Sequence, residues 1–87
     1  MDYLKYVSNG YFAINTDSYK PEYFDSHGLM ARFKVVSGEL RISSMNYRRE
    51  IEYFAEYPVA TGETLDFIGE VKLCGNATVQ YILFDKV

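Results

Sequence analysis

The sequence predicts an α+β fold: an antiparallel, strongly twisted sheet of five or six strands built from three hairpins, with one helix around residues 46–57. Runs of aromatic and β-branched residues are separated by glycine-containing turn signals, and apolar residues alternate with polar ones within the runs. One further segment is rich in Arg, Glu and Ala, which favour helix. With 87 residues, the chain is expected to form a single compact domain over residues 1–87.

The first hairpin is predicted over residues 3–16, where the runs YLKYV and YFAINT flank Ser8, Asn9 and Gly10. An Asn-Gly pair between such runs is the strongest short hairpin signal, because both residues tolerate the positive φ of a type I′ turn. Residues 17–28 are rich in turn formers and are expected to form a loop, in which Pro21 is suited to open a single helical turn.

Two more hairpins are predicted around glycines. LMARFKVV and LRISS flank residues 37–39, and Ala31, Phe33 and Val35 fall on one face of the first run. TLDFIGEVKL and TVQYILF flank residues 74–77, with Gly69 as a candidate bulge or close-packing site. The apolar residues of the third hairpin also recur at every second position: Leu65, Phe67, Val71 and Leu73.

The segment YRREIEYFAEY, residues 47–57, fits two structures. As a helix it is capped by Asn46, ended by Pro58, and has one apolar stripe formed by Tyr47, Ile51, Phe54 and Ala55. As a strand it places Tyr53 and Tyr57 on one face and the glutamates on the other. Its Arg, Glu and Ala content favours the helix, and the strand alternative gives an all-β small barrel.

The formal net charge of -3 hides an uneven distribution. Residues 50–71 contain six acidic side chains and no basic one, whereas residues 32–49 carry five basic side chains against Glu39. If the acidic side chains converge, they form a face that repels phosphate and attracts a basic protein patch. The simpler alternative is a solvated acidic surface that keeps a small protein soluble.

Motifs that would indicate an enzyme are missing. The six glycines are dispersed, so no phosphate-binding loop is formed, and neither a Gly-x-Ser-x-Gly nor a Cys-x-x-Cys motif occurs. The single cysteine, Cys74, and the single histidine, His27, are too few for a zinc site, and the EF-hand spacing is absent. We therefore expect no enzymatic activity, no metal site and no cofactor.

Two further features of the sequence predict where in the cell the protein is found. The longest apolar run, residues 81–84, is too short to span a membrane, and the first residues lack the pattern of an export signal. We expect a cytoplasmic protein that does not bind membranes.

Tyrosine is unusually frequent, with nine residues in 87. The thin core of a small domain cannot supply hydrogen-bond partners for nine buried hydroxyls, so some tyrosines must reach the surface. Exposed tyrosine is enriched in protein interfaces because it gives a large contact area at low cost in side-chain entropy. The predicted partner-binding residues are Tyr53 and Tyr57 as anchors, with Arg49, Glu50, Glu52 and Glu56 beside them.

These observations favour a non-catalytic, small acidic protein-binding module: an inhibitor, immunity-type or accessory protein that occludes a partner carrying a basic patch. In style, though in no motif, the chain resembles accessory proteins of phages and other mobile elements. One alternative is a single-stranded nucleic-acid-binding β domain that uses residues 32–49, and another is a small-ligand-binding protein. A homodimer is a further option, through TVQYILF if this run lies at a sheet edge.

Overall fold

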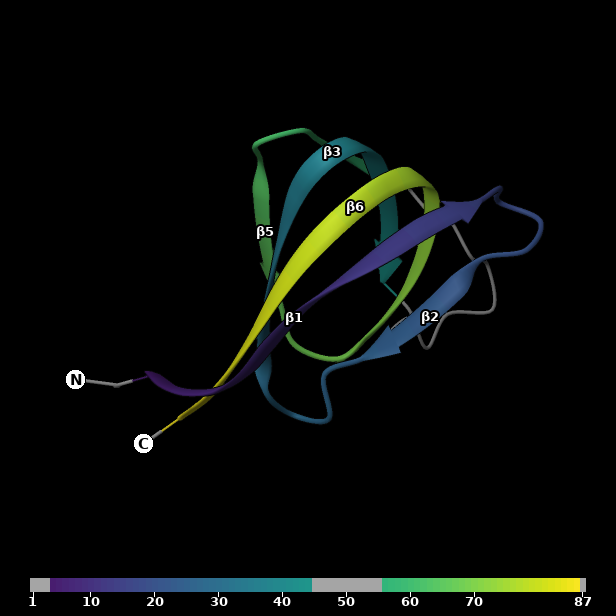
Figure 1. Ribbon diagram of the computed structural model, residues 1–87. Coiled ribbons are helices and arrows are strands. Elements are labelled where there is room, and N and C mark those ends of the chain that lie inside the picture. Colours follow the sequence, from purple (N-terminus) through teal and green to yellow (C-terminus); the bar gives the residue numbers. More distant parts are fainter. Residues whose placement is uncertain (1–3, 45–55, 87) are drawn as a thin grey trace, which may run out of the picture.

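The computed structural model describes residues 4–44 and 56–86, which form one antiparallel six-stranded sheet (Figure 1). Its strands are β1 (Leu4–Thr16), β2 (Glu22–Asp25), β3 (Met30–Ser44), β4 (Tyr57–Ala60), β5 (Thr64–Phe67) and β6 (Glu70–Lys86). The described residues contain no helix, so the predicted α+β class is wrong and this part of the chain is all-β. Of the helix predicted around residues 46–57, residues 46–55 lie outside the described residues, and Tyr57 begins strand β4.

The long strand β6 organises the sheet. β1 and β2 pair in succession with one edge of β6, and β3 pairs with its other edge. β4 and β5 then pair with the far edge of β3. In the described residues the sheet is open, with β1 and β2 along one edge and β4 and β5 along the other, and is not closed into a barrel.

The three predicted hairpins are wrong, because each predicted turn lies inside a continuous strand. Asn9 and Gly10 pair with Ile82 and Tyr81 in the middle of β1. Residues 37–39 lie inside β3 and pair with residues 76–78, which lie inside β6. The sheet is thus made of three long strands, of 13, 15 and 17 residues, and three short ones.

The glycines of the predicted turns have a different use, which is close approach between neighbouring strands. A Cβ atom on Gly10 would lie 2.7 Å from the hydroxyl oxygen of Tyr81, so the tyrosine ring occupies the space of the missing side chain. Gly38 and Gly75 have φ angles of +80° and +110°, and a Cβ atom on either would meet the backbone of the facing strand. These two residues mark where β3 and β6 bend, a curvature that Figure 1 displays.

The bends fold the sheet onto itself. Phe24 lies opposite Val71 near the start of β6, and Phe33 lies opposite Tyr81 near its end, yet the two phenylalanine rings are 4.9 Å apart. Phe33 is fully buried and also contacts the rings of Phe12 and Phe67, at 5.3 and 4.8 Å. The core therefore lies on the inner, concave face of the sheet.

The predicted alternation is confirmed. Ala31, Phe33 and Val35 are all 0% exposed, whereas Lys34 between them is exposed. Gly69, at φ +121°, separates β5 from β6, and its backbone exchanges hydrogen bonds with Ser26. Within the described ranges, no helix has the length and apolar character needed to cross a membrane.

Candidate functional site

Within the described residues, two arginines of the basic block lie beside two carboxylates of the acidic block and partly compensate them. Arg32 on β3 donates two hydrogen bonds to the carboxylate of Asp66 on β5, at 2.9 and 3.0 Å. These hydrogen bonds and the charge of Asp66 raise the pKa of the Arg32 guanidinium above its ordinary value. Arg41 on β3 lies 3.8 Å from a carboxylate oxygen of Glu56. The described acids of residues 50–71 are thus partly neutralised by β3 and form no single free acidic face.

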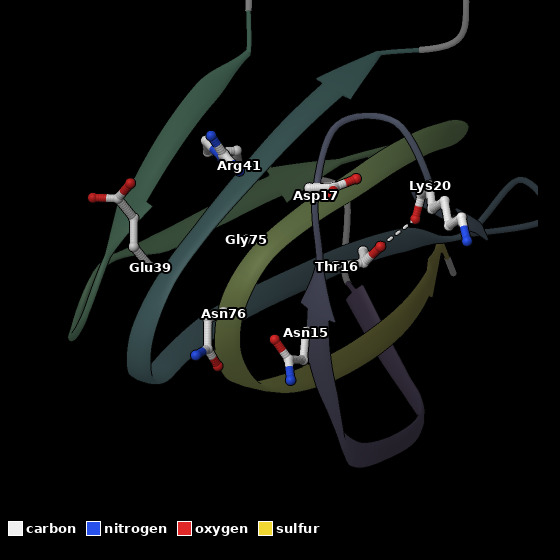
Figure 2. Close-up of a pocket in the computed structure, with 8 residues that line it drawn as sticks. All are labelled: Asn15, Thr16, Asp17, Lys20, Glu39, Arg41, Gly75 and Asn76. Atoms are coloured by element: carbon white, nitrogen blue, oxygen red, sulfur yellow. Dashed lines mark hydrogen bonds between the residues drawn. The ribbon is translucent and has the colours of Figure 1, made fainter.

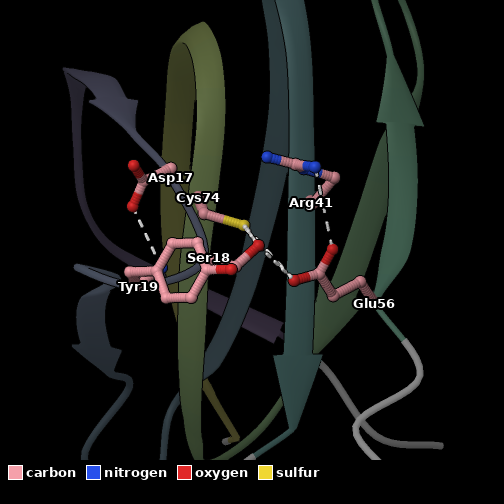
Figure 3. Close-up of polar contacts among 6 residues, drawn as sticks. All are labelled: Asp17, Ser18, Tyr19, Arg41, Glu56 and Cys74. Carbon is pink, nitrogen blue, oxygen red and sulfur yellow. Dashed lines mark hydrogen bonds and ion pairs between the residues drawn. The ribbon is translucent and has the colours of Figure 1, made fainter.

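Glu56 links three parts of the fold (Figure 3). Its Oε1 accepts a hydrogen bond from the Ser18 hydroxyl at 2.9 Å and lies 3.8 Å from the Cys74 sulfur, while its Oε2 faces Arg41. Cys74 is only 5% exposed, and its sulfur lies 3.9 Å from the Ser18 hydroxyl. Glu56 therefore ties the loop after β1 to β3 and β6, and its carboxylate is already engaged within the chain.

The predicted partner-binding residues are only partly described. Tyr57 is 58% exposed, but it pairs with the buried Ile42, so it lies at the rim of the inner face. The other predicted residues besides Glu56 lie outside the described residues: Arg49, Glu50, Glu52 and Tyr53. As a binding surface, this group stays a prediction.

The prediction that tyrosines reach the surface is confirmed. Among the described residues, Tyr81 packs against the core, and the other tyrosines are between 55% and 93% exposed: Tyr6, Tyr11, Tyr19, Tyr23 and Tyr57. They do not share one surface, because Tyr19 lies in a loop and Tyr57 on the inner side of the sheet.

Two of these tyrosines belong to an aromatic patch on the convex side of the sheet. Directly paired residues of an antiparallel sheet point to the same face. The pairing aligns Tyr6 with Phe84 and Met30 in one row, and Tyr11 with Gln80 and Lys34 in another. Asn9, Ile82 and Arg32 form the row between them. We call the surface formed by these nine residues the outer face.

The outer face combines exposed rings with half-buried apolar side chains. Tyr6 and Tyr11 on β1 are 55% and 66% exposed, while Met30, Ile82 and Phe84 on the two neighbouring strands are half-buried. The Arg32 guanidinium lies 5.5 Å from the centre of the Phe84 ring, a cation–π arrangement. The surface thus offers apolar contact area with one ring covered by a cation.

A polar hollow of about 640 Å³ lies beyond the bend at Gly75 (Figure 2). Asn15, Asn76 and Glu39 form a row across β1, β6 and β3, and Gly75 lies beside Asn76 in the lining. The Thr16 hydroxyl donates to the backbone oxygen of Lys20, which orders the loop on one side. The lining carries two acidic and two basic side chains: Asn15, Thr16, Asp17, Lys20, Glu39, Arg41, Gly75 and Asn76. Such a site is able to hydrogen-bond a polar molecule without net charge.

The described residues hold no cluster of metal-ligating side chains, and the candidate base His27 lies at the surface. No group of three or more His, Cys, Asp and Glu side chains is placed to hold a metal ion in residues 4–44 and 56–86. The side chain of His27 is 84% exposed, and its nearest described carboxylate, that of Asp25, is 3.8 Å away. No protein-family model matches the chain, and no curated protein matches it. We therefore infer function from the surface geometry.

Proposed function

We propose that this chain is a non-catalytic protein-binding module that contacts its partner through the outer face. The observation that carries the proposal is the exposure of Tyr6 and Tyr11 beside the half-buried Ile82 and Phe84 on one side of a sheet. Tyrosine gains contact area at a small entropic cost, and half-buried apolar side chains give a partner a desolvated centre. The module would act by occluding the surface it covers.

The charge pairing favours a protein partner over single-stranded nucleic acid. A base-stacking platform needs accessible rings; the Phe84 ring lies under the Arg32 guanidinium, which leaves Tyr6 and Tyr11 as the accessible rings of the outer face. Arg32 and Arg41 are each engaged by a carboxylate, which reduces their availability to phosphates. The net charge of -3 acts in the same direction. Nucleic-acid binding through residues 32–49 is therefore the weaker alternative.

The chemistry of the partner is apolar and aromatic in this proposal. Glu56 and Asp66 add little electrostatic attraction toward a basic patch on a partner, because both carboxylates already pair with arginines of this chain. A role of Glu50 and Glu52 toward such a patch stays a prediction. The contribution of charge can be measured directly, since steering by exposed charges weakens as salt is raised.

A comparative pull-down from the native cell tests the proposal. Wild type is compared with the double variant Tyr6→Ser/Tyr11→Ser and with the matched control Tyr19→Ser/Tyr23→Ser, whose tyrosines are 93% and 59% exposed. We expect one stoichiometric protein with wild type and control, and about tenfold less with the outer-face variant, since a tyrosine anchor contributes more than 1 kcal/mol. Equal recovery with all three, or recovery of nucleic acid alone, contradicts the proposal.

The polar hollow supports small-ligand binding as a second candidate. Its two acidic and two basic side chains suit a neutral or zwitterionic polar molecule, but ligand pockets are usually lined mostly by apolar groups. Nuclear magnetic resonance titration with free amino acids and simple sugars tests it. Saturable shifts confined to Asn15, Lys20 and Asn76 support the candidate, and their absence at millimolar ligand removes it.

A further inference from the structure

The outer edge of β1 is a long and unprotected strand edge. β1 stands at one end of the sheet order, and no strand of the described residues pairs with the edge turned away from β6. Natural proteins protect such edges with charges, prolines or bulges. Residues 8–16, SNGYFAINT, contain neither a charge nor a proline, and the irregularity of β1 lies before them, between Tyr6 and Ser8. This edge has the properties of a pairing surface.

We infer that two copies of this chain pair β1 with β1 in antiparallel orientation across a two-fold axis. The regular part of β1 is self-complementary about Phe12. On the outer side, this register places Tyr11 opposite Ala13 of the second copy, and Asn9 opposite Asn15. On the inner side it places Gly10 opposite Ile14, and Ser8 opposite Thr16. At the centre, Phe12 meets Phe12 of the second copy. On either side of it, large side chains meet small ones, and polar side chains meet polar ones that can hydrogen-bond.

Three considerations favour a second copy as the occupant. The uncharged edge offers nine residues, about 30 Å of strand, to a second copy. The uncharged segment lets a chain of net charge -3 approach its copy without like charges meeting at the seam. A standard interface of about 800 Å² per partner is also roughly one eighth of the 6127 Å² surface, a useful addition to a small core.

The inferred dimer contact lies on β1 and not at TVQYILF, where the sequence predicted it. That run lies in β6, which is paired with β1 on one side and β3 on the other, so it offers no edge. The dimer does not require the proposed function, but the two surfaces share Tyr11 and Asn9, whose side chains stay on the convex side of the joined sheets. Two copies would present two outer faces side by side.

Light scattering on paired variants tests the dimer. Ala13→Lys places charges at the seam, and the control Ala60→Lys makes the same change at an exposed position of β4, on the opposite edge of the sheet. We expect wild type and Ala60→Lys to show about twice the chain mass of 10.1 kDa, and Ala13→Lys to show the monomer mass. A monomeric wild type at about 1 mM, where even weak pairs associate, overturns the inference, as does a dimer unaffected by Ala13→Lys.

Mixed cysteine variants test the register without depending on the stability of Ala13→Lys. Tyr11→Cys and Ala13→Cys proteins are mixed and oxidised. Directly opposed positions lie about 4.5–5.5 Å apart at Cβ, near the reach of a disulfide, whereas diagonal positions lie about 7–8 Å apart. We expect the mixed covalent dimer to exceed either homodimer several-fold. Equal amounts of the three products, or none, overturn the register. Neither experiment involves the binding partner, so their failure leaves the proposed function to its own test.

Discussion

A Gly75→Ala substitution is expected to destabilise the fold strongly, because Gly75 lies inside β6 at the bend that lets β6 and β3 approach. Its φ of +110° is a conformation that residues with a side chain rarely adopt, and an added Cβ would lie 2.5 Å from the backbone oxygen of Glu39. Both strands must then shift, since no flexible side chain is there to move aside. The bend and the pairing on both sides of it would be disturbed together.

The two contributions can be estimated separately. Holding a residue with a side chain in a rare backbone conformation costs about 1–3 kcal/mol. Overpacking against a rigid neighbour costs about 1–3 kcal/mol more. Gly75→Ala should therefore lower the free energy of unfolding by about 2–6 kcal/mol, a large share of the roughly 4–13 kcal/mol expected for 87 residues.

The chain supplies its own control in Gly62. This glycine has a φ of +88° in the turn between β4 and β5, and nothing lies within 4 Å of an added Cβ. Gly62→Ala should lower the free energy of unfolding only by the cost of the backbone conformation, about 1–2 kcal/mol. Urea unfolding of both variants at 25 °C gives the comparison. If Gly75→Ala costs no more than Gly62→Ala, Gly75 lies in an open turn and the account of a continuous β6 is wrong.

Three further predictions use the same unfolding assay. Phe33→Ala should cost about 3–5 kcal/mol, because the fully buried ring joins both ends of the folded sheet; a loss below about 1.5 kcal/mol would mean that the ring is not enclosed. Gly10→Ala should lower the free energy of unfolding, because the new methyl group meets the Tyr81 hydroxyl. Tyr81→Leu removes this hydroxyl and should partly rescue the loss. Independent effects of the two substitutions would contradict the contact. Asp66→Asn should cost less than about 1 kcal/mol, with a smaller loss at high salt, as expected for half-exposed ion pairs; a larger, salt-independent loss would refute this.

Local patterns identified the runs that form β1, β3, β5 and β6, but not the continuity of the long strands. They also missed β2, which lies in the predicted loop of residues 17–28, and β4, which begins where the helix was predicted to end. The alternation of Ala31, Phe33 and Val35 gave the buried face of β3 correctly. The same runs, separated by glycine, fit either a hairpin or one long bent strand, since glycine serves tight turns and close strand contacts equally well. Pairing partners far along the chain decide between the two, as Gly10 beside Tyr81 illustrates. A single sequence does not reveal that pairing.

The sequence predicted the type of side chain at the candidate site, exposed tyrosine, but not which tyrosines form it. The excess of tyrosine correctly indicated exposed rings, and Tyr57 is exposed as expected. Tyr6, Tyr11 and Phe84 were missed as a group because only the β1–β6 register brings them to one face. The acidic face failed to emerge among the described residues for a related reason: β3 lies beside β4 and β5, so Arg32 and Arg41 meet the acidic residues. Alternation of side chains along β6 was the one available signal for Ile82 and Phe84.

Both the outer face and the β1 edge require that β1 runs without a turn from Leu4 to Thr16. Nuclear Overhauser contacts of Phe12 in solution provide the most direct measurement. Pairing with β6 predicts cross-strand contacts between the backbones of Phe12 and Val79. Contacts between Phe12 and Val7 instead, as a turn at Asn9 and Gly10 would produce, would contradict the strand order from which both surfaces are derived.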